Sequence, residues 1–222
     1  MAKIEHEQSL PGELAIFPLR SALLLPRGQL PLNVFEPRYL AMTDHALKNH
    51  RLIGMTRPRH EDDVNPELYD IGCAGRITSF METGDGRYLL TLTGVSRFRI
   101  LSEGLSDGGF RMAQVDWAPF TYDLYADAEE ESHLLREQVI DLLMRYLDDA
   151  GLQADWDSIE GASAETIINS VSMSCPFTAD EKQALIEANS IEERGRTLMT
   201  LMEMAIAQKR QDLDDDGSER LQ

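Results

Sequence analysis

The sequence lacks any long apolar run, and its first residues lack the features of a secretory signal. No stretch approaches the roughly 20 apolar residues that span a bilayer, and the run Leu23–Leu25 is stopped by Pro26. The first ten residues carry charges of both signs and have no apolar core. We therefore expect no membrane association and a cytoplasmic location.

Cysteine is scarce, and the residue types that hold metals are scattered. Cys73 and Cys175 form no C-x-x-C pair, which excludes a zinc knuckle and a thioredoxin-type redox motif. None of the five histidines has a metal-binding spacing, and no serine lies in a G-x-S-x-G motif. We therefore expect two buried, reduced thiols, no metal, no cofactor and no enzymatic activity.

Basic side chains are few, and the two halves of the chain differ in charge. The 222 residues carry a net charge of −18. Residues 1–120 hold 15 acidic and 13 basic side chains, whereas residues 121–222 hold 24 and 8. Because this acidic excess repels a phosphate backbone, no general affinity for nucleic acid is expected. A basic protein surface is a permitted partner, although acidic excess also simply keeps proteins soluble.

The first half has the pattern of β-structure with one helix. Short apolar or alternating segments bounded by Pro and Gly predict strands over Leu14–Leu19, Gln29–Phe35, Leu52–Thr56, Ile71–Phe80, Tyr88–Val95, Arg97–Leu101 and Phe110–Trp117. Between the second and third of these, apolar residues at helical spacing predict a helix over Arg38–His50, with Pro37 in its first turn. Six or seven short strands indicate a small, strongly bent sheet or barrel.

The second half has the pattern of helices. An apolar stripe at helical period runs through Asp127–Asp149, and Gly151 is placed to end that helix. Ser163–Met173 is a shorter candidate, and capping-box patterns at Thr178–Glu181 and Ser190–Glu193 predict two further helix starts. The last helix is expected to reach about Lys209. The acidic tail, residues 211–222, lacks apolar periodicity and is expected to be disordered.

Three stretches of the first half carry a family resemblance. They are Phe17–Arg20 through Phe35–Tyr39 (FPLR to FEPRY), then Ile71–Ile77, then Asp85–Tyr88 through Gly94–Ile100. In this order and spacing they resemble the amino-terminal, substrate-binding domain of Lon protease, in a stand-alone form. The resemblance implies an α+β fold with a PUA-like β-barrel over residues 1–120, a helical bundle over 121–210 and the tail over 211–222. The boundary is expected near residues 118–126.

The catalytic parts of Lon have no counterpart in this sequence. The ATPase of that family needs a Gly-rich phosphate loop that ends in Gly-Lys-Ser/Thr. The four lysines are Lys3, Lys48, Lys182 and Lys209, and none follows a glycine. The family's protease domain uses a serine–lysine pair, and this sequence has no remaining segment that could supply it. The resemblance therefore implies substrate binding without ATPase or protease chemistry.

Eight residues are candidates for binding. Phe35, Glu36, Arg38 and Tyr39 form a conspicuous strand-to-helix corner, where the charged pair either clamps a carboxylate or only fixes the corner, the reading we favour. Arg97 and Arg99 point to one face of a strand, which is either solvated or in contact with a peptide. Met199 and Met202 either present an adaptable apolar surface or, more often for such spacing, fill the core.

Three functions fit these patterns, and the oligomeric state stays open. The first is a module that binds exposed apolar or extended segments of other proteins, in a groove or on a sheet edge. The second is an adaptor or regulator that docks on a folded partner, such as proteolytic machinery, through the acidic helical half. The third is RNA binding by a PUA-like barrel, which the acidic charge makes the weakest of the three.

Overall fold

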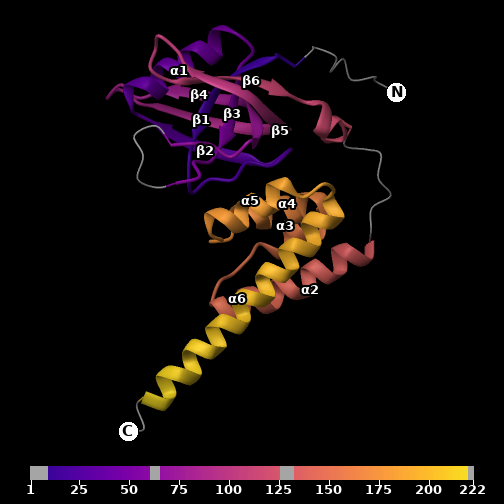
Figure 1. Ribbon diagram of the computed structural model, residues 1–222. Helices are drawn as coiled ribbons and strands as arrows, with labels where there is room; N and C mark the ends of the chain where they lie inside the picture. Colours follow the sequence, from indigo (N-terminus) through magenta and orange to yellow (C-terminus); the bar gives the residue numbers. More distant parts are fainter. Residues whose placement is uncertain (1–9, 61–65, 126–132, 220–222) are drawn as a thin grey trace. The chain divides into compact units, whose positions relative to one another are not determined.

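The computed structural model describes residues 10–60, 66–125 and 133–219 (Figure 1). The chain divides into two compact units, Met1–Ala128 and Glu129–Gln222. The first unit is built on a six-stranded mixed sheet, and the second consists of helices. The α+β class predicted from the sequence is therefore confirmed.

The strands of the first unit form a hydrogen-bonded ladder that returns to its own start. They are β1 (Glu13–Pro18), β2 (Gln29–Val34), β3 (Leu52–Thr56), β4 (Ile71–Glu82), β5 (Tyr88–Leu105) and β6 (Arg111–Asp116). The sheet order is β2-β5-β4-β3-β1-β6, and the second half of β5 also pairs with β6. Of the strand pairs in the described residues, β1 with β3 alone is parallel. Among the described strands, β2 is left as an edge, because it pairs with β5 alone.

One strand, which runs through Gly94, replaces the two that were predicted over Tyr88–Val95 and Arg97–Leu101. β5 continues through this glycine, with a shift in register against β4 between Ala74 and Gly75. Position 94 needs glycine because another part of the backbone approaches it closely. A Cβ at this position would lie 2.0 Å from the Leu25 carbonyl oxygen.

The core of the first unit lies among its strands, and α1 (Pro37–Lys48) packs against two of them. The centre of this core is formed by apolar side chains from most of the strands: Leu14, Ile16, Leu52, Leu68, Ala74, Phe98, Ala113 and Val115. α1 packs against β1 and β3, and the Tyr39 ring lies 4.4 Å from that of Phe17. Pro37 occupies the first turn of α1, as predicted, where its missing N–H costs nothing.

The first unit includes the segment that follows its last strand. A 3₁₀ segment, η1 (Ala118–Leu124), follows β6 and lies against β5. The Asp123 carboxylate accepts three hydrogen bonds from Arg97 of β5. Because these bonds tie η1 to the sheet, the division between the units falls after Ala128.

Local sequence signals explain the starts of two helices in the second unit. Its helices are α2 (His133–Ala150), α3 (Trp156–Glu160), α4 (Ala164–Ser174), α5 (Ala179–Glu187) and α6 (Ile191–Glu219). Ser163 caps α4, and Thr178 with Glu181 forms the full capping box predicted for α5. The predicted helix start at Asp127 lies outside the described residues, but Gly151 ends α2 with a φ of 69°.

The last helix is longer than predicted. α6 continues to Glu219, so the segment expected to be disordered from residue 211 is helical up to that point. Residues 210–219 contain no proline, and each added residue of a helix that has already formed gains one backbone hydrogen bond. The absence of apolar periodicity was therefore a poor indicator of where this helix stops.

Candidate binding surface

The corner between β2 and α1 holds four of the eight residues predicted to bind. Glu36 and Arg38 form an ion pair of 2.9 Å, with about half of each side chain exposed. Tyr39 is buried, and the Arg38 guanidinium lies 4.6 Å from its ring centroid. Burial raises the pKa of the Tyr39 phenol, and the Arg38 charge opposes the rise. These contacts favour a corner-fixing role for Glu36 and Arg38 and leave Phe35, 59% exposed, facing solvent.

Breaking the corner pair should have little effect on stability. We expect Glu36→Gln to lower the free energy of unfolding by less than about 1 kcal/mol, because exposed ion pairs contribute little. Urea unfolding of the variant and the wild type measures the difference. A loss of several kcal/mol would show that Glu36 does more than position Arg38.

Exposed apolar side chains gather on one face of the strands next to this corner. Leu89 of β5 lies opposite Met81 of β4 and Asn33 of β2, and residues directly opposite in an antiparallel ladder share a face. Pro31 is two residues before Asn33 on the same face. The Arg87 guanidinium, two residues before Leu89, lies 5.7 Å from the Phe35 ring centroid.

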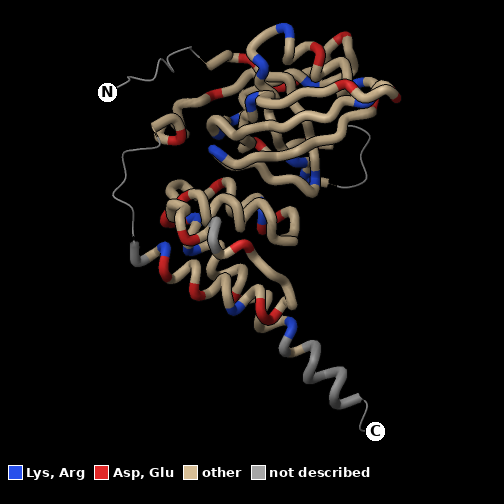
Figure 2. Tube along the Cα trace, turned by 180° about the vertical axis from the view of Figure 1, so that it is seen from behind, with Lys and Arg blue, Asp and Glu red and all other residues tan. Residues whose placement is uncertain are grey.

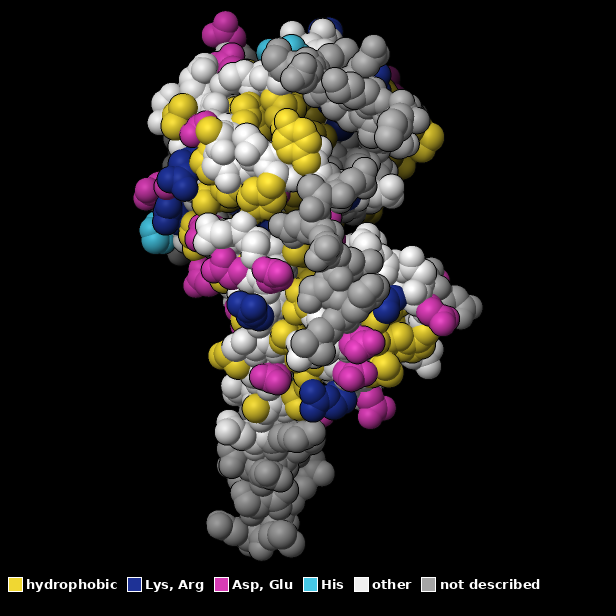
Figure 3. Space-filling model, turned by 90° about the vertical axis from the view of Figure 1, so that its right-hand side faces the viewer, with side chains coloured by type: hydrophobic (Ala, Val, Ile, Leu, Met, Phe, Trp, Pro, Cys, Tyr) yellow, Lys and Arg dark blue, Asp and Glu magenta, His cyan; other side chains and the backbone are white. Residues whose placement is uncertain are grey.

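We call this group, Pro31, Phe35, Met81 and Leu89, the outer-face patch. Met81 is 55% exposed, Leu89 37%, and Pro31 is also exposed. Their neighbours on the opposite face, Val34 and Leu90, belong to the core. Figure 3 shows hydrophobic side chains reaching the surface over parts of both units. The patch is therefore a set of apolar groups that the fold itself leaves uncovered.

The side of the hairpin that faces α1 is organised by Tyr88. Its ring meets that of Phe80 edge-on at 5.0 Å, and its hydroxyl donates a hydrogen bond of 3.1 Å to the Asp44 carboxylate of α1. Burial, together with this hydrogen bond, raises the pKa of the Tyr88 phenol. The phenol is thereby kept as a donor that links the start of β5 to α1.

The open edge of β2 is poorly suited to pairing with a long added strand. Pro31, in the middle of the strand, has no N–H to donate. Proline on an edge strand is a common protection against edge-to-edge pairing. The patch therefore offers apolar side-chain contacts more readily than a run of backbone hydrogen bonds.

The comparisons with known proteins assign this architecture to a family. Residues 13–204 match the family described as the ATP-dependent protease La (LON) substrate-binding domain. This chain belongs to that family. Among curated relatives, Lon protease of Anaeromyxobacter dehalogenans is 24% identical over 205 residues and Lon protease 2 of Myxococcus xanthus 26%, each over 89% of this chain. The chain spans about a quarter of their length, 24% in both cases.

Solved structures of Lon amino-terminal domains share the fold. The crystal structure of a Lon N-terminal domain protein from Xanthomonas campestris has a TM-score of 0.58 at 22% identity, covering 85% of this chain and 97% of that one. The N-terminal domain of Lon protease from Mycobacterium avium complex has a TM-score of 0.65 at 17% identity, covering 86% and 98%. At these identities the likeness concerns the fold alone.

Arg97 does not lie on a solvated strand face. Its side chain is 0% exposed, and its guanidinium binds the Asp123 carboxylate through Nε and Nη2 at 3.0 Å each. Burial lowers the pKa of Arg97, but the hydrogen bonds and charges of Asp123 and Tyr122 outweigh it, so the pKa is raised. The solvated-face reading is therefore wrong for Arg97, because η1 covers it. Arg99 is exposed, as that reading requires.

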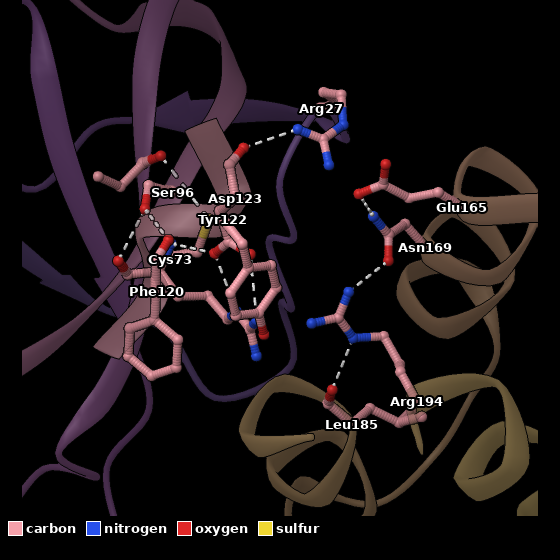
Figure 4. A network of polar contacts seen from close by, with 12 residues as sticks. Arg27, Cys73, Ser96, Phe120, Tyr122, Asp123, Glu165, Asn169, Leu185 and Arg194 are labelled. Carbon is pink, nitrogen blue, oxygen red and sulfur yellow. Dashed lines mark hydrogen bonds and ion pairs between the residues drawn. The ribbon is translucent and has the colours of Figure 1, made fainter. Parts of the chain in front are cut away.

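The methionines of α6 differ in their burial within the helical unit. Met202 is 0% exposed and Met199 half-buried, which favours the core interpretation, whereas Met204 is 59% exposed. Buried polar contacts also link the helices: Arg194 of α6 donates to Asn169 of α4 at 2.8 Å and to the Leu185 carbonyl at 2.9 Å (Figure 4).

Sequence reasoning missed Pro31, Met81 and Leu89 of the outer-face patch. Alternation along β4 and β5 could have indicated that Met81 and Leu89 face outward, but not that they lie opposite each other. The described residues include no group of three or more His, Cys, Asp or Glu side chains that could hold a metal ion. Within that same part of the chain, no helix is long and apolar enough to cross a membrane.

Proposed function

We propose that this chain is a non-catalytic binding module that holds exposed apolar or extended segments of other proteins on the outer-face patch. The observation that carries the proposal is the alignment of Leu89 with Met81 on an exposed sheet face, beside Phe35. The family is described as the substrate-binding domain of an ATP-dependent protease, which supports the same role. We also infer that the self-closing ladder of the first unit is the PUA-like barrel that the resemblance implies.

Polypeptide segments suit the patch for a physical reason. Its exposed Phe, Met and Leu side chains gain about 25 cal/mol for each Å² of apolar surface removed from water. Met is unbranched and polarisable, so it can adapt to different partners. A shallow, adaptable surface without an unbroken row of backbone donors favours weak binding to many sequences over tight binding to one.

The adaptor alternative has less support. Figure 2 shows acidic residues along the helices of the second unit interspersed with Lys and Arg. A docking face of uniformly negative charge would be expected to exclude basic side chains. Arg136 and Arg145 both lie on α2, which does not fit this expectation. The RNA alternative requires a basic stripe with interleaved aromatics, which the sequence does not provide.

The patch can be tested by a double substitution on its two opposed residues. The ligand is a reduced, alkylated protein that cannot refold. We expect Met81→Thr with Leu89→Thr to weaken its binding about tenfold, because two apolar side chains that the bound segment would cover are lost. Threonine keeps the strand propensity of both positions. Fluorescence anisotropy of the labelled unfolded protein, titrated with the full chain, measures the dissociation constant.

A matched control uses two exposed leucines elsewhere on β5. Leu101 is 65% and Leu105 73% exposed, and both lie on the part of β5 beyond its pairing with β4. Leu101→Thr with Leu105→Thr should leave binding within about twofold of wild type. Equal losses in both double variants, or none in the first, would count against the outer-face patch.

A further inference from the structure

A cleft of about 460 Å³ lies between α1 and the turn that joins β5 to β6, both in the first unit. One wall is a single face of α1, with Ala41, Asp44, His45 and Lys48. The other wall is the turn from Ser106 to Phe110. The volume is within the range of about 300–1,000 Å³ that is usual for ligand sites.

The turn wall is held firmly in place. The backbone N–H and the hydroxyl of Ser106 both donate to the Phe110 carbonyl, at 2.9 and 2.8 Å, and Gly109 donates to the Ser106 carbonyl. Gly109 has a φ of +76°, which favours glycine. Phe110 is buried and its ring lies 5.4 Å from that of His45, so the two walls meet on an aromatic contact.

The charges that line the cleft favour a cation. Asp44 and Asp107 face it from opposite walls, and Lys48 is one turn along α1 from Asp44. None of the three forms an ion pair within 4.0 Å with another residue in the described ranges. Two carboxylates, one ammonium and the His45 imidazole line the cleft, so its net charge with a neutral imidazole is negative, above a floor formed by Ala41 and Phe110. An aliphatic stem ending in a cation matches that combination.

We propose that this cleft accepts a lysine or arginine side chain of the polypeptide that the outer-face patch binds. The stem would lie against Ala41 and Phe110, and the cationic end would lie between Asp44 and Asp107. The inference rests on the proposed function, since it gives the bound segments a second determinant. Preferred segments then combine apolar residues with a basic residue.

The separation of the two sites predicts a spacing. The Phe35 corner leads directly into α1, and Arg38 and Asp44 are six residues apart on that helix. At 1.5 Å per residue this is a rise of about 9 Å along α1. The patch lies on the sheet face away from α1, so the connecting peptide needs more than the roughly three extended residues that this rise alone corresponds to. Tyr88 joins the two sites physically, because it begins β5 next to Leu89 and donates to Asp44.

The test compares labelled peptides that share an apolar core and differ at one position. Lysine, glutamine or glutamate is placed three, six or nine residues from the core, and each peptide is titrated with the full chain. At the favoured spacing we expect lysine to bind about fivefold tighter than glutamine and glutamate to bind most weakly. Asp44→Asn with Asp107→Asn should remove the lysine preference, and the amide introduced at position 44 keeps an acceptor for Tyr88.

The control variant removes two exposed carboxylates from other places on the same unit. Glu13 accepts a hydrogen bond from Gln114, and Glu67 lies 3.7 Å from Arg59. Glu13→Gln with Glu67→Gln should retain the lysine preference. Equal binding of the three peptides, or a preference that survives in the cleft variant, would overturn the proposal.

A fragment experiment separates the failure of the cleft from the failure of the patch. N-acetyl-lysine-N-methylamide, at millimolar concentration, should shift the backbone amide resonances of Ala41 and Gly108 in the wild type, while the glutamine analogue should not. Shifts without peptide binding would support the cleft and contradict the proposed function. Peptide binding without a lysine preference, and without shifts, would contradict the cleft alone, and the absence of both would contradict both.

Discussion

Replacing Asp123 with alanine is expected to lower the free energy of unfolding of the first unit by about 3–5 kcal/mol. The carboxylate accepts hydrogen bonds from Nε and Nη2 of Arg97, and a third of 2.9 Å from its backbone N–H. The alanine variant would leave a fully buried guanidinium without its counter-charge. It would also release η1, whose Phe120 ring lies 4.6 Å from the Arg97 guanidinium.

Urea unfolding in a Trp156→Phe background measures this loss. The chain has two tryptophans, and Trp117 then reports on the first unit alone. A milder variant, Asp123→Asn, keeps one acceptor oxygen and should cost less, which separates the charge from the hydrogen bonds. The control is Asp70→Ala, because Asp70 is exposed and lies 3.6 Å from Arg59. It should cost less than about 1 kcal/mol, and a similar value for Asp123→Ala would refute the role of the pair.

The Arg97 pair shows why sequence reasoning failed at some positions. The alternation Arg97-Phe98-Arg99-Ile100 is what a half-solvated strand also shows, so it could not separate Arg97 from Arg99. The distinction depends on Asp123, 26 residues later, in a segment with no strong helix or strand signal. Burial of a charge is set by a partner distant in the chain, which local periodicity does not report.

Local signals were reliable where the physics is local. Pro37 at the start of α1 and the Thr178–Glu181 capping box of α5 depend on residues within one helical turn, and both were predicted. Only part of the outer-face patch can be recognised from neighbouring residues in the sequence. Phe35 stood out from its own neighbours, whereas Met81 and Leu89 gain significance from the register between β4 and β5.

A further non-local contact fixes the loop before β2. Leu25–Gly28 is a turn in which the Gly28 N–H donates to the Leu25 carbonyl at 3.0 Å, and Arg27 adopts a left-handed φ of 64°. The Arg27 N–H donates to the Gly94 carbonyl, and its guanidinium donates to the Asp123 carbonyl at 2.8 Å. This turn therefore joins β5 and η1, and its packing on β5 depends on what occupies position 94.

Gly94→Ala is expected to destabilise the first unit by more than about 3 kcal/mol, or to prevent it from folding. The added Cβ would lie 2.0 Å from the Leu25 carbonyl oxygen and 2.8 Å from the Leu25 carbonyl carbon. Both atoms are backbone, so no rotamer change relieves the overlap. The turn would have to move, and with it the contacts of Arg27. Urea unfolding followed by Trp117 fluorescence measures the loss, and circular dichroism reports a variant that does not fold.

The matched control is a glycine ten residues later on the same strand. A Cβ at Gly104 would meet nothing within 4 Å, and its φ is not in the left-handed region. Gly104→Ala should therefore leave the free energy of unfolding within about 1 kcal/mol of wild type, or raise it slightly by restricting the unfolded chain. Because both substitutions add the same methyl group to β5, the difference between them isolates the contact with Leu25. A Gly94→Ala protein as stable as Gly104→Ala would mean that the turn can shift freely, and that β5 does not depend on it.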